Sequence, residues 1–68
     1  MTMFWTRIRA LQTQIDAIPY TDRGAYAPRE AYNHQERAVL ALLALPPRRE
    51  DAQYHLTEAE GLLASWQG

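Results

Sequence analysis

Residues 38–45 read AVLALLAL, the longest apolar run in this sequence of 68 residues. The run is far shorter than the roughly 20 apolar residues that a membrane-spanning helix needs. Pro46 and Pro47 follow it directly. Proline lacks a backbone N–H and clashes with the preceding helical turn, so a helix containing this run should stop there. The run therefore predicts the end of a helix around which the other segments pack.

This helix is predicted over residues 28–45, because Pro28 suits a first helical position. A helical wheel divides it into one polar or small stripe and two apolar faces. The stripe contains Glu30, Asn33, His34, Arg37, Ala41 and Ala44. One apolar face holds Tyr32, Val39 and Leu43, and the other holds Ala31, Ala38, Leu42 and Leu45. A helix with two apolar faces should contact two neighbours, and Leu40 lies outside both faces.

A preceding helix is predicted over residues 3–18, with Thr2 as its N-cap and Pro19 ending it. Its large apolar residues recur at spacings of four and three, which is typical of a narrow seam between two other helices. These residues are Phe4, Ile8, Leu11, Ile15 and Ile18. Trp5 lies about 100° from Phe4 on the wheel, so it falls outside the seam.

A third helix is predicted over residues 48–66, with Glu50 and Asp51 in the first turn, where the helix dipole favours acids. Its inward arc contains Ala52, Leu56, Ala59, Leu63 and Trp66, widened by His55 and Leu62. The small residues at 52 and 59 would let this helix approach the leucine-rich helix closely. Tyr54 points outward on the same wheel.

The connections predict how the three helices are arranged. Pro46-Pro47 makes a short connection, so the second and third helices should be antiparallel neighbours. Residues 19–27 should form a longer loop, with a turn in which Gly24 can take positive φ. Tyr20 and Tyr26 are expected to pin this loop with buried rings. We therefore predict a single all-α domain over residues 1–68, an up-down-up three-helix bundle. The alternative is a helical hairpin that completes its core by dimerising.

Composition narrows the classes of function. The net charge is −1, with seven arginines against eight acidic residues, so no overall electrostatic attraction to nucleic acid or an anionic membrane is expected. The chain has no cysteine, which excludes disulfides and thiolate metal sites. The N-terminal segment contains Arg7, Arg9 and Asp16 and does not resemble a signal peptide. We therefore expect a cytoplasmic protein.

Candidate catalytic and metal-binding residues are few. If the two later helices turn at Pro46-Pro47, then Glu30, His34, His55 and Glu58 could approach one another, and imidazole with carboxylate suits zinc or iron. However, the sequence contains no HExxH motif and no pair of ExxH motifs. A histidine such as His55 on an apolar arc more often belongs to the core. We predict no metal site, no cofactor and no enzymatic activity.

Several large side chains lie outside the seams that a monomeric bundle requires, and this pattern favours a protein-binding function. We predict a small regulator, adaptor or inhibitor that occludes a surface of a larger protein, of the kind that phages or mobile elements encode. The expected partner-binding residues are Trp5, Leu40 and Tyr54 as anchors, with Arg7, Arg9 and Arg37 making polar contacts. The alternatives are a homodimeric assembly subunit and a small DNA-binding regulator.

Overall fold

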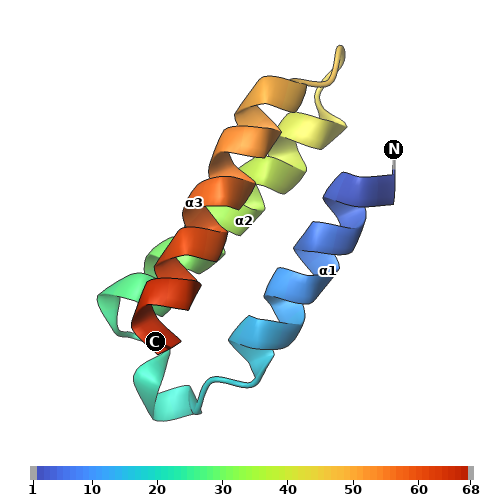
Figure 1. The fold of residues 1–68 in the computed structure, drawn as a ribbon. Coiled ribbons are helices and arrows are strands. Elements are labelled where there is room, and N and C mark those ends of the chain that lie inside the picture. The colour runs from blue at the N-terminus through green and yellow to red at the C-terminus, as the bar shows by residue number, and fades with distance from the viewer. Residues whose placement is uncertain (1, 68) are drawn as a thin grey trace.

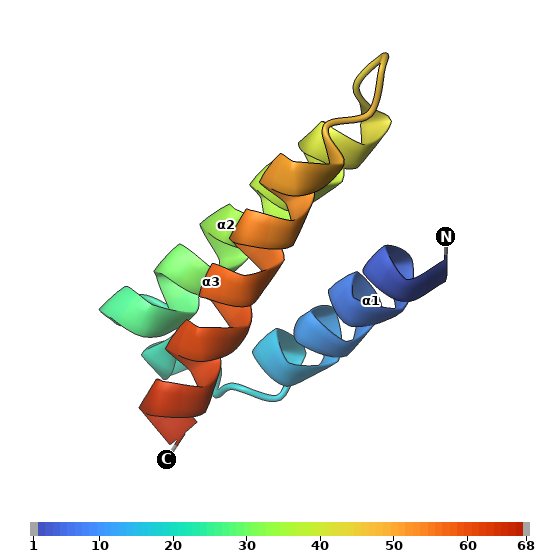
Figure 2. The same cartoon turned by 45° about the horizontal axis from the view of Figure 1, so that its top comes forward.

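The chain folds into a three-helix bundle, as its periodicity predicts (Figure 1). The computed structural model describes residues 2–67, excluding the side chains of Thr2 and Gln67, so the capping role predicted for Thr2 lies outside it. Within this range the elements are α1 (Thr2–Asp16), a short 3-10 helix η1 (Tyr20–Asp22), α2 (Tyr26–Leu43) and α3 (Arg49–Gln67). Successive helices run in opposite directions in an elongated body of 37 × 19 × 18 Å (Figure 2).

Two helices end earlier than predicted, each before a proline. A residue that precedes proline is pushed towards extended backbone, so a helix cannot continue through it. α1 ends at Asp16, where residue 18 was expected, and the Ile18 N–H donates to the Ile15 carbonyl at 3.1 Å. α2 ends at Leu43, where residue 45 was expected, and Ala44 is already extended with ψ 157°. Both helices therefore end before the residue that the following proline restricts.

α2 begins two residues before Pro28, at Tyr26. The Ala25 carbonyl accepts the first helical hydrogen bond, from the Arg29 N–H at 3.1 Å. Pro28 lies within the first turn, where the backbone N–H groups have no acceptor inside the helix, so its missing N–H costs nothing there. The Pro28 side chain is fully buried, and it therefore also helps to close the core at the end where the loop joins α1 to α2.

α2 and α3 form a tight antiparallel hairpin, which confirms the prediction from Pro46-Pro47. The Arg48 N–H closes the hairpin by donating to the Ala41 carbonyl at 2.9 Å. The interface is lined with alanines that are buried almost completely, namely Ala31, Ala38 and Ala41 on α2 and Ala52 and Ala59 on α3. The wheel placed Ala41 on the outward stripe, and this was wrong. The close approach of α3 covers a position that a wider interhelical spacing would leave open.

α1 packs across this hairpin through the predicted seam. Ile8, Leu11, Ile15 and Ile18 are buried against Leu56 and Leu63 of the common core, and Phe4 is partly buried beside them. In both views the α1 ribbon stands farther from α2 and α3 than these two stand from each other (Figures 1 and 2). Large side chains fill the wide interface with α1, whereas alanines fill the narrow one between α2 and α3.

The loop between α1 and α2 differs from the prediction. Tyr20 and Tyr26 are exposed, so neither ring pins the loop, and Gly24 does not adopt positive φ. Arg23, and not the tyrosines, fixes the position of the loop. Its guanidinium donates to the carbonyls of Ile18 and Asp16, each at 3.0 Å. The Asp16 carbonyl ends α1 and the Ile18 carbonyl follows it, so a cation is well suited to this C-terminal end of the helix.

The second apolar face of α2 is not covered as predicted. Of the face that holds Tyr32, Val39 and Leu43, the structure leaves Tyr32 and Leu43 exposed, and Leu45 of the other face is exposed as well. Trp66 of α3 was expected to point inward but is also exposed. None of the helices described within residues 2–67 has the length and apolar character needed to span a lipid bilayer.

Candidate functional site

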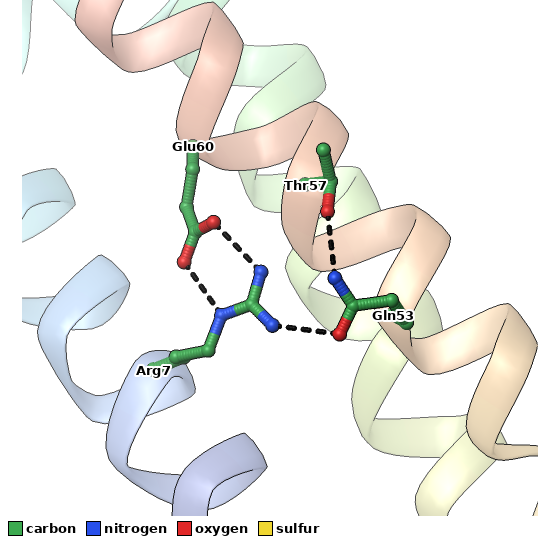
Figure 3. A network of polar contacts seen from close by, with 4 residues as sticks. All are labelled: Arg7, Gln53, Thr57 and Glu60. Carbon is green, nitrogen blue, oxygen red and sulfur yellow. Dashed lines mark hydrogen bonds and ion pairs between the residues drawn. The ribbon is translucent and has the colours of Figure 1, made fainter.

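A polar network joins α1 to α3 and occupies the Arg7 side chain (Figure 3). The guanidinium makes a two-pronged contact with Glu60, with Nε to Oε2 at 2.9 Å and Nη2 to Oε1 at 2.7 Å. Its remaining nitrogen, Nη1, donates to Gln53 Oε1 at 2.9 Å, and Gln53 in turn donates to Thr57 Oγ1. The hydrogen bond to Glu60 raises the pKa of Arg7, while partial burial opposes this. Arg7 therefore fastens α1 to the hairpin.

Breaking this pair should weaken the docking of α1. The two side chains are 25% and 42% exposed, so solvent screens the attraction, and a double-mutant cycle of Arg7→Met and Glu60→Gln should give a coupling energy of about 0.5–1 kcal/mol. The coupling should fall in 1 M NaCl, since the Debye length there is only about 3 Å. Urea unfolding followed by circular dichroism measures both values.

Arg48 and Asp51 provide the matched control for this cycle. Their contact of 3.4 Å is single, both side chains are more than half exposed, and the two residues lie three apart on one helix. A cycle of Arg48→Met and Asp51→Asn should therefore give a smaller coupling energy. Equal coupling in the two cycles would contradict a docking role for Arg7.

A second polar contact lies inside the bundle, between α1 and α2. Gln35 is buried, and its Nε2 donates to Gln12 Oε1 at 2.8 Å. A buried amide needs a partner, so this bond favours the register that places residue 12 beside residue 35. The sequence pattern did not single out either glutamine. The only signal was the position of Gln35 between Ala31 and Ala38 on an otherwise apolar arc.

The two histidines of the chain meet on the opposite face of the hairpin, away from α1. His34 of α2 and His55 of α3 bring their Nδ1 atoms to 2.8 Å, with ring centroids 5.0 Å apart. The Tyr54 ring packs edge-on against both imidazoles. A contact this short needs a proton on one Nδ1 and a lone pair on the other. Burial lowers the pKa of His55; the charges of His34 and Arg37 lower it further, while Asp51 and Glu58 oppose the shift.

The contact between His34 and His55 should make the free energy of unfolding decrease in mild acid. Because the folded-state pKa of His55 lies below its unfolded value of about 6.5, the unfolded chain binds more protons, and acid favours it. The contribution is complete above pH 6.5 and is lost as the pH falls through the folded-state pKa. Loss of one such hydrogen bond is worth about 0.5–1.5 kcal/mol. Thermal unfolding between pH 7.5 and pH 5, with a metal chelator present, measures it.

The matched variant for this prediction is His34→Gln, which removes the partner and leaves His55 in place. Its melting temperature should change less than that of the wild type over the same pH range. An identical pH dependence in the two proteins would show that other groups cause the loss of stability.

The C-terminal end of α2 carries a group of exposed leucines, which we call the leucine patch. It consists of Leu40, Leu43 and Leu45, whose residues are 63%, 64% and 95% exposed. Leu40 also lines a surface groove of about 280 Å³ with Gln12, Tyr32, Gln35, Glu36 and Val39. This groove lies between α1 and α2, because its lining comes from those two helices. Leu40 belongs to both the patch and the groove, so the two adjoin at this residue.

Trp5 belongs to the same side of the molecule. It lies seven residues, or two helical turns, before Gln12, so both residues occupy one face of α1. Gln12 accepts a hydrogen bond from Gln35 of α2, so this face of α1 is directed towards α2. In the antiparallel register, Trp5 then lies level with the last turn of α2, which carries Leu43. The indole is exposed and can extend the leucine patch across the groove.

The predicted partner-binding residues therefore do not form one site. Leu40 lines the groove between α1 and α2, Trp5 is exposed on the α1 face that is directed towards α2, and Tyr54 packs beside the histidine pair. Arg9 and Arg37 are exposed, and Arg37 lines a different groove with Leu40 and His55. Arg7 is engaged within the chain. The wheel did not identify Leu43 and Leu45 as surface residues, because it assigned each of them to a covered apolar face.

Comparison of the chain with models of protein families, with curated proteins and with solved structures finds no match. The fold and the surface define a small three-helix protein with an uncovered apolar end, and function is inferred from these features.

Proposed function

We propose that this protein is a non-enzymatic protein-binding module that acts as a regulator, adaptor or inhibitor by covering a surface of a larger protein. The observation that carries the proposal is the leucine patch. Three large aliphatic side chains within six consecutive residues are exposed to solvent, at the C-terminal end of α2. Isolated exposed apolar residues are common, but a contiguous group on a small domain is typical of an interaction site.

Burial of the leucine patch would contribute favourable free energy to the binding of a partner. Burying one exposed leucine side chain fully is worth about 1.5–3 kcal/mol, so the three residues of the patch offer several kcal/mol before the costs of association. Trp5 adds an aromatic side chain of the type that dominates binding energy at interfaces. The patch, the groove and Trp5 would then form the central contact, with polar residues around it.

The shape of the surface favours one class of partner contact. A groove between two antiparallel helices accepts the apolar side of a further helix, as in other helix-in-groove interactions. Glu36 lines the groove on α2, and Arg9 is an exposed cation on α1, so charges of both signs are available on these two helices. A partner segment with apolar residues on one side and mixed charges on its flanks fits this arrangement.

The experiment is affinity capture with the protein as bait, compared quantitatively between wild type and Leu43→Glu. A charge in the centre of the patch must be desolvated on binding, so capture of the specific partner should fall at least about tenfold. The matched control is Ala64→Glu, which places the same charge at an exposed position of α3. Circular dichroism should show equal helix content in all three proteins.

Two results would contradict the proposal: equal capture by wild type and Leu43→Glu, or no protein retained specifically by the wild type. Light scattering on the same proteins tests the alternative of a homodimeric subunit. A wild-type dimer that becomes a monomer on Leu43→Glu would assign the patch to a second copy of this chain. A separate Tyr54→Ala arm measures whether the interface extends to the histidine face.

A further inference from the structure

The histidine pair places two potential metal-ligating nitrogens from different helices side by side. His34 comes from α2 and His55 from α3, and these are the only two histidines of the chain. Both side chains are partly buried, with ring planes inclined by 34°. His55 lies on the other side of α3 from Gln53 and Glu60, which bond to Arg7 of α1. Both histidine side chains remain partly exposed there, and their Nδ1 atoms are 2.8 Å apart.

We propose that His34 and His55 form a two-imidazole site for one divalent transition-metal ion, such as Zn²⁺, bound through both Nδ1 atoms. Nitrogen ligands lie about 2.0–2.1 Å from Zn²⁺, so two of them on one ion are about 2.9–3.4 Å apart for angles between square and tetrahedral. The observed distance is close to the lower end of this range. In the hydrogen-bonded pair the two Nδ1 atoms point at each other, so both rings must turn out of this alignment for their lone pairs to meet on one ion.

The surroundings define which ion fits. Neutral imidazole prefers Zn²⁺, Cu²⁺ or Ni²⁺ over the oxygen-seeking ions Mg²⁺ and Ca²⁺. Asp51 and Glu58 act electrostatically on His55 and would offset the positive charge of an ion, whereas Arg37 opposes it. Within residues 2–67, no set of three or more histidine, aspartate and glutamate side chains is arranged to hold a metal. Water would therefore complete the coordination, as at metal sites with open positions.

Binding at this site would link α2 to α3 and would stabilise the fold. An ion that binds the folded chain and not the unfolded one stabilises the fold by RT ln(1 + c/Kd), where c is the ion concentration, so the melting temperature should rise with the logarithm of c once c exceeds Kd. The inference is independent of the proposed function, because it concerns the imidazoles and not the leucine patch. If the wild-type protein captured no partner, the proposed metal site would still stand. If the protein bound no metal, the proposed protein-binding function would still stand.

The test uses tag-free protein, since a histidine tag would dominate metal binding. The chain is treated with a chelator, exchanged into buffer at pH 7.5 and titrated with ZnCl₂ in a calorimeter and in a melting experiment. We expect saturable binding and a higher melting temperature with Zn²⁺, and no change with Mg²⁺. In ¹⁵N spectra of the imidazole rings, Zn²⁺ should shift Nδ1 of both histidines.

Variants separate a built site from nonspecific binding. His34→Gln and His55→Gln should each weaken Zn²⁺ binding by at least about tenfold, because the second imidazole acts as an intramolecular ligand at high effective concentration. The control is Asp22→Asn, which removes a carboxylate from η1 and should bind as the wild type does. Coordination through Nε2, or an affinity unchanged in either histidine variant, would overturn the proposal.

Discussion

Leu56→Ala should leave much of the protein unfolded at 25 °C. Leu56 is completely buried on α3, in the core where all three helices meet. Removing a buried leucine side chain down to alanine costs about 2–5 kcal/mol, through lost burial and the cavity that remains. A helical bundle of this size without disulfides rarely has more than about 3–5 kcal/mol of stability in total. One substitution therefore removes most of the free energy of unfolding.

Helix content and urea unfolding, both followed by circular dichroism, measure this effect. The matched control is Leu40→Ala, the same chemical change at an exposed position of α2, which should alter stability by less than about 0.5 kcal/mol. Similar losses from the two substitutions would mean that Leu56 is not in the core, and that α3 is rotated relative to the structure described here.

Ala59→Leu should have the second largest effect, by forcing α2 and α3 apart. His34 and His55 lie level in the antiparallel hairpin, so Ala31, three residues before the first, faces Ala59, four residues after the second. Both alanines are completely buried, and neither leaves space for a larger side chain. Overpacking a core position costs about 1–3 kcal/mol, and more where two backbones approach closely.

Ala64→Leu provides the control on the same helix, because Ala64 is exposed and the change adds the same volume and a residue of similar helix propensity. Urea unfolding should separate the two variants by at least about 1 kcal/mol. Stability of Ala59→Leu equal to that of wild type would show that the hairpin tolerates a wider interhelical spacing. The close packing of alanines would then be incidental.

The helices themselves could be predicted from periodicity and prolines. The α1 seam from Ile8 to Ile18 and the α3 arc from Ala52 to Leu63 are buried as the spacings of four and three indicated. The errors at the helix ends have one cause, which is that proline also restricts the residue before it. The error at Ala41 has another cause, since a wheel shows direction and not the distance to the neighbouring helix.

The candidate sites were less predictable. Exposure of Trp5, Leu40 and Tyr54 followed from their positions outside the seams, and the structure confirms it. The meeting of His34 with His55 was only one possibility among several, because a shift of one helical turn would separate them. The role of Arg7 was not foreseen, because no local pattern relates it to Glu60, 53 residues later.

In this chain the sequence alone determines where the helices lie, because the apolar spacing and the prolines act within a few residues of sequence. The distances between helices and their registers follow from packing. Alanines allow α2 and α3 to approach closely, while the large seam of α1 holds it farther away. The leucine patch and the histidine pair both depend on these registers. They arise from contacts between residues distant in sequence, which no single helical wheel contains.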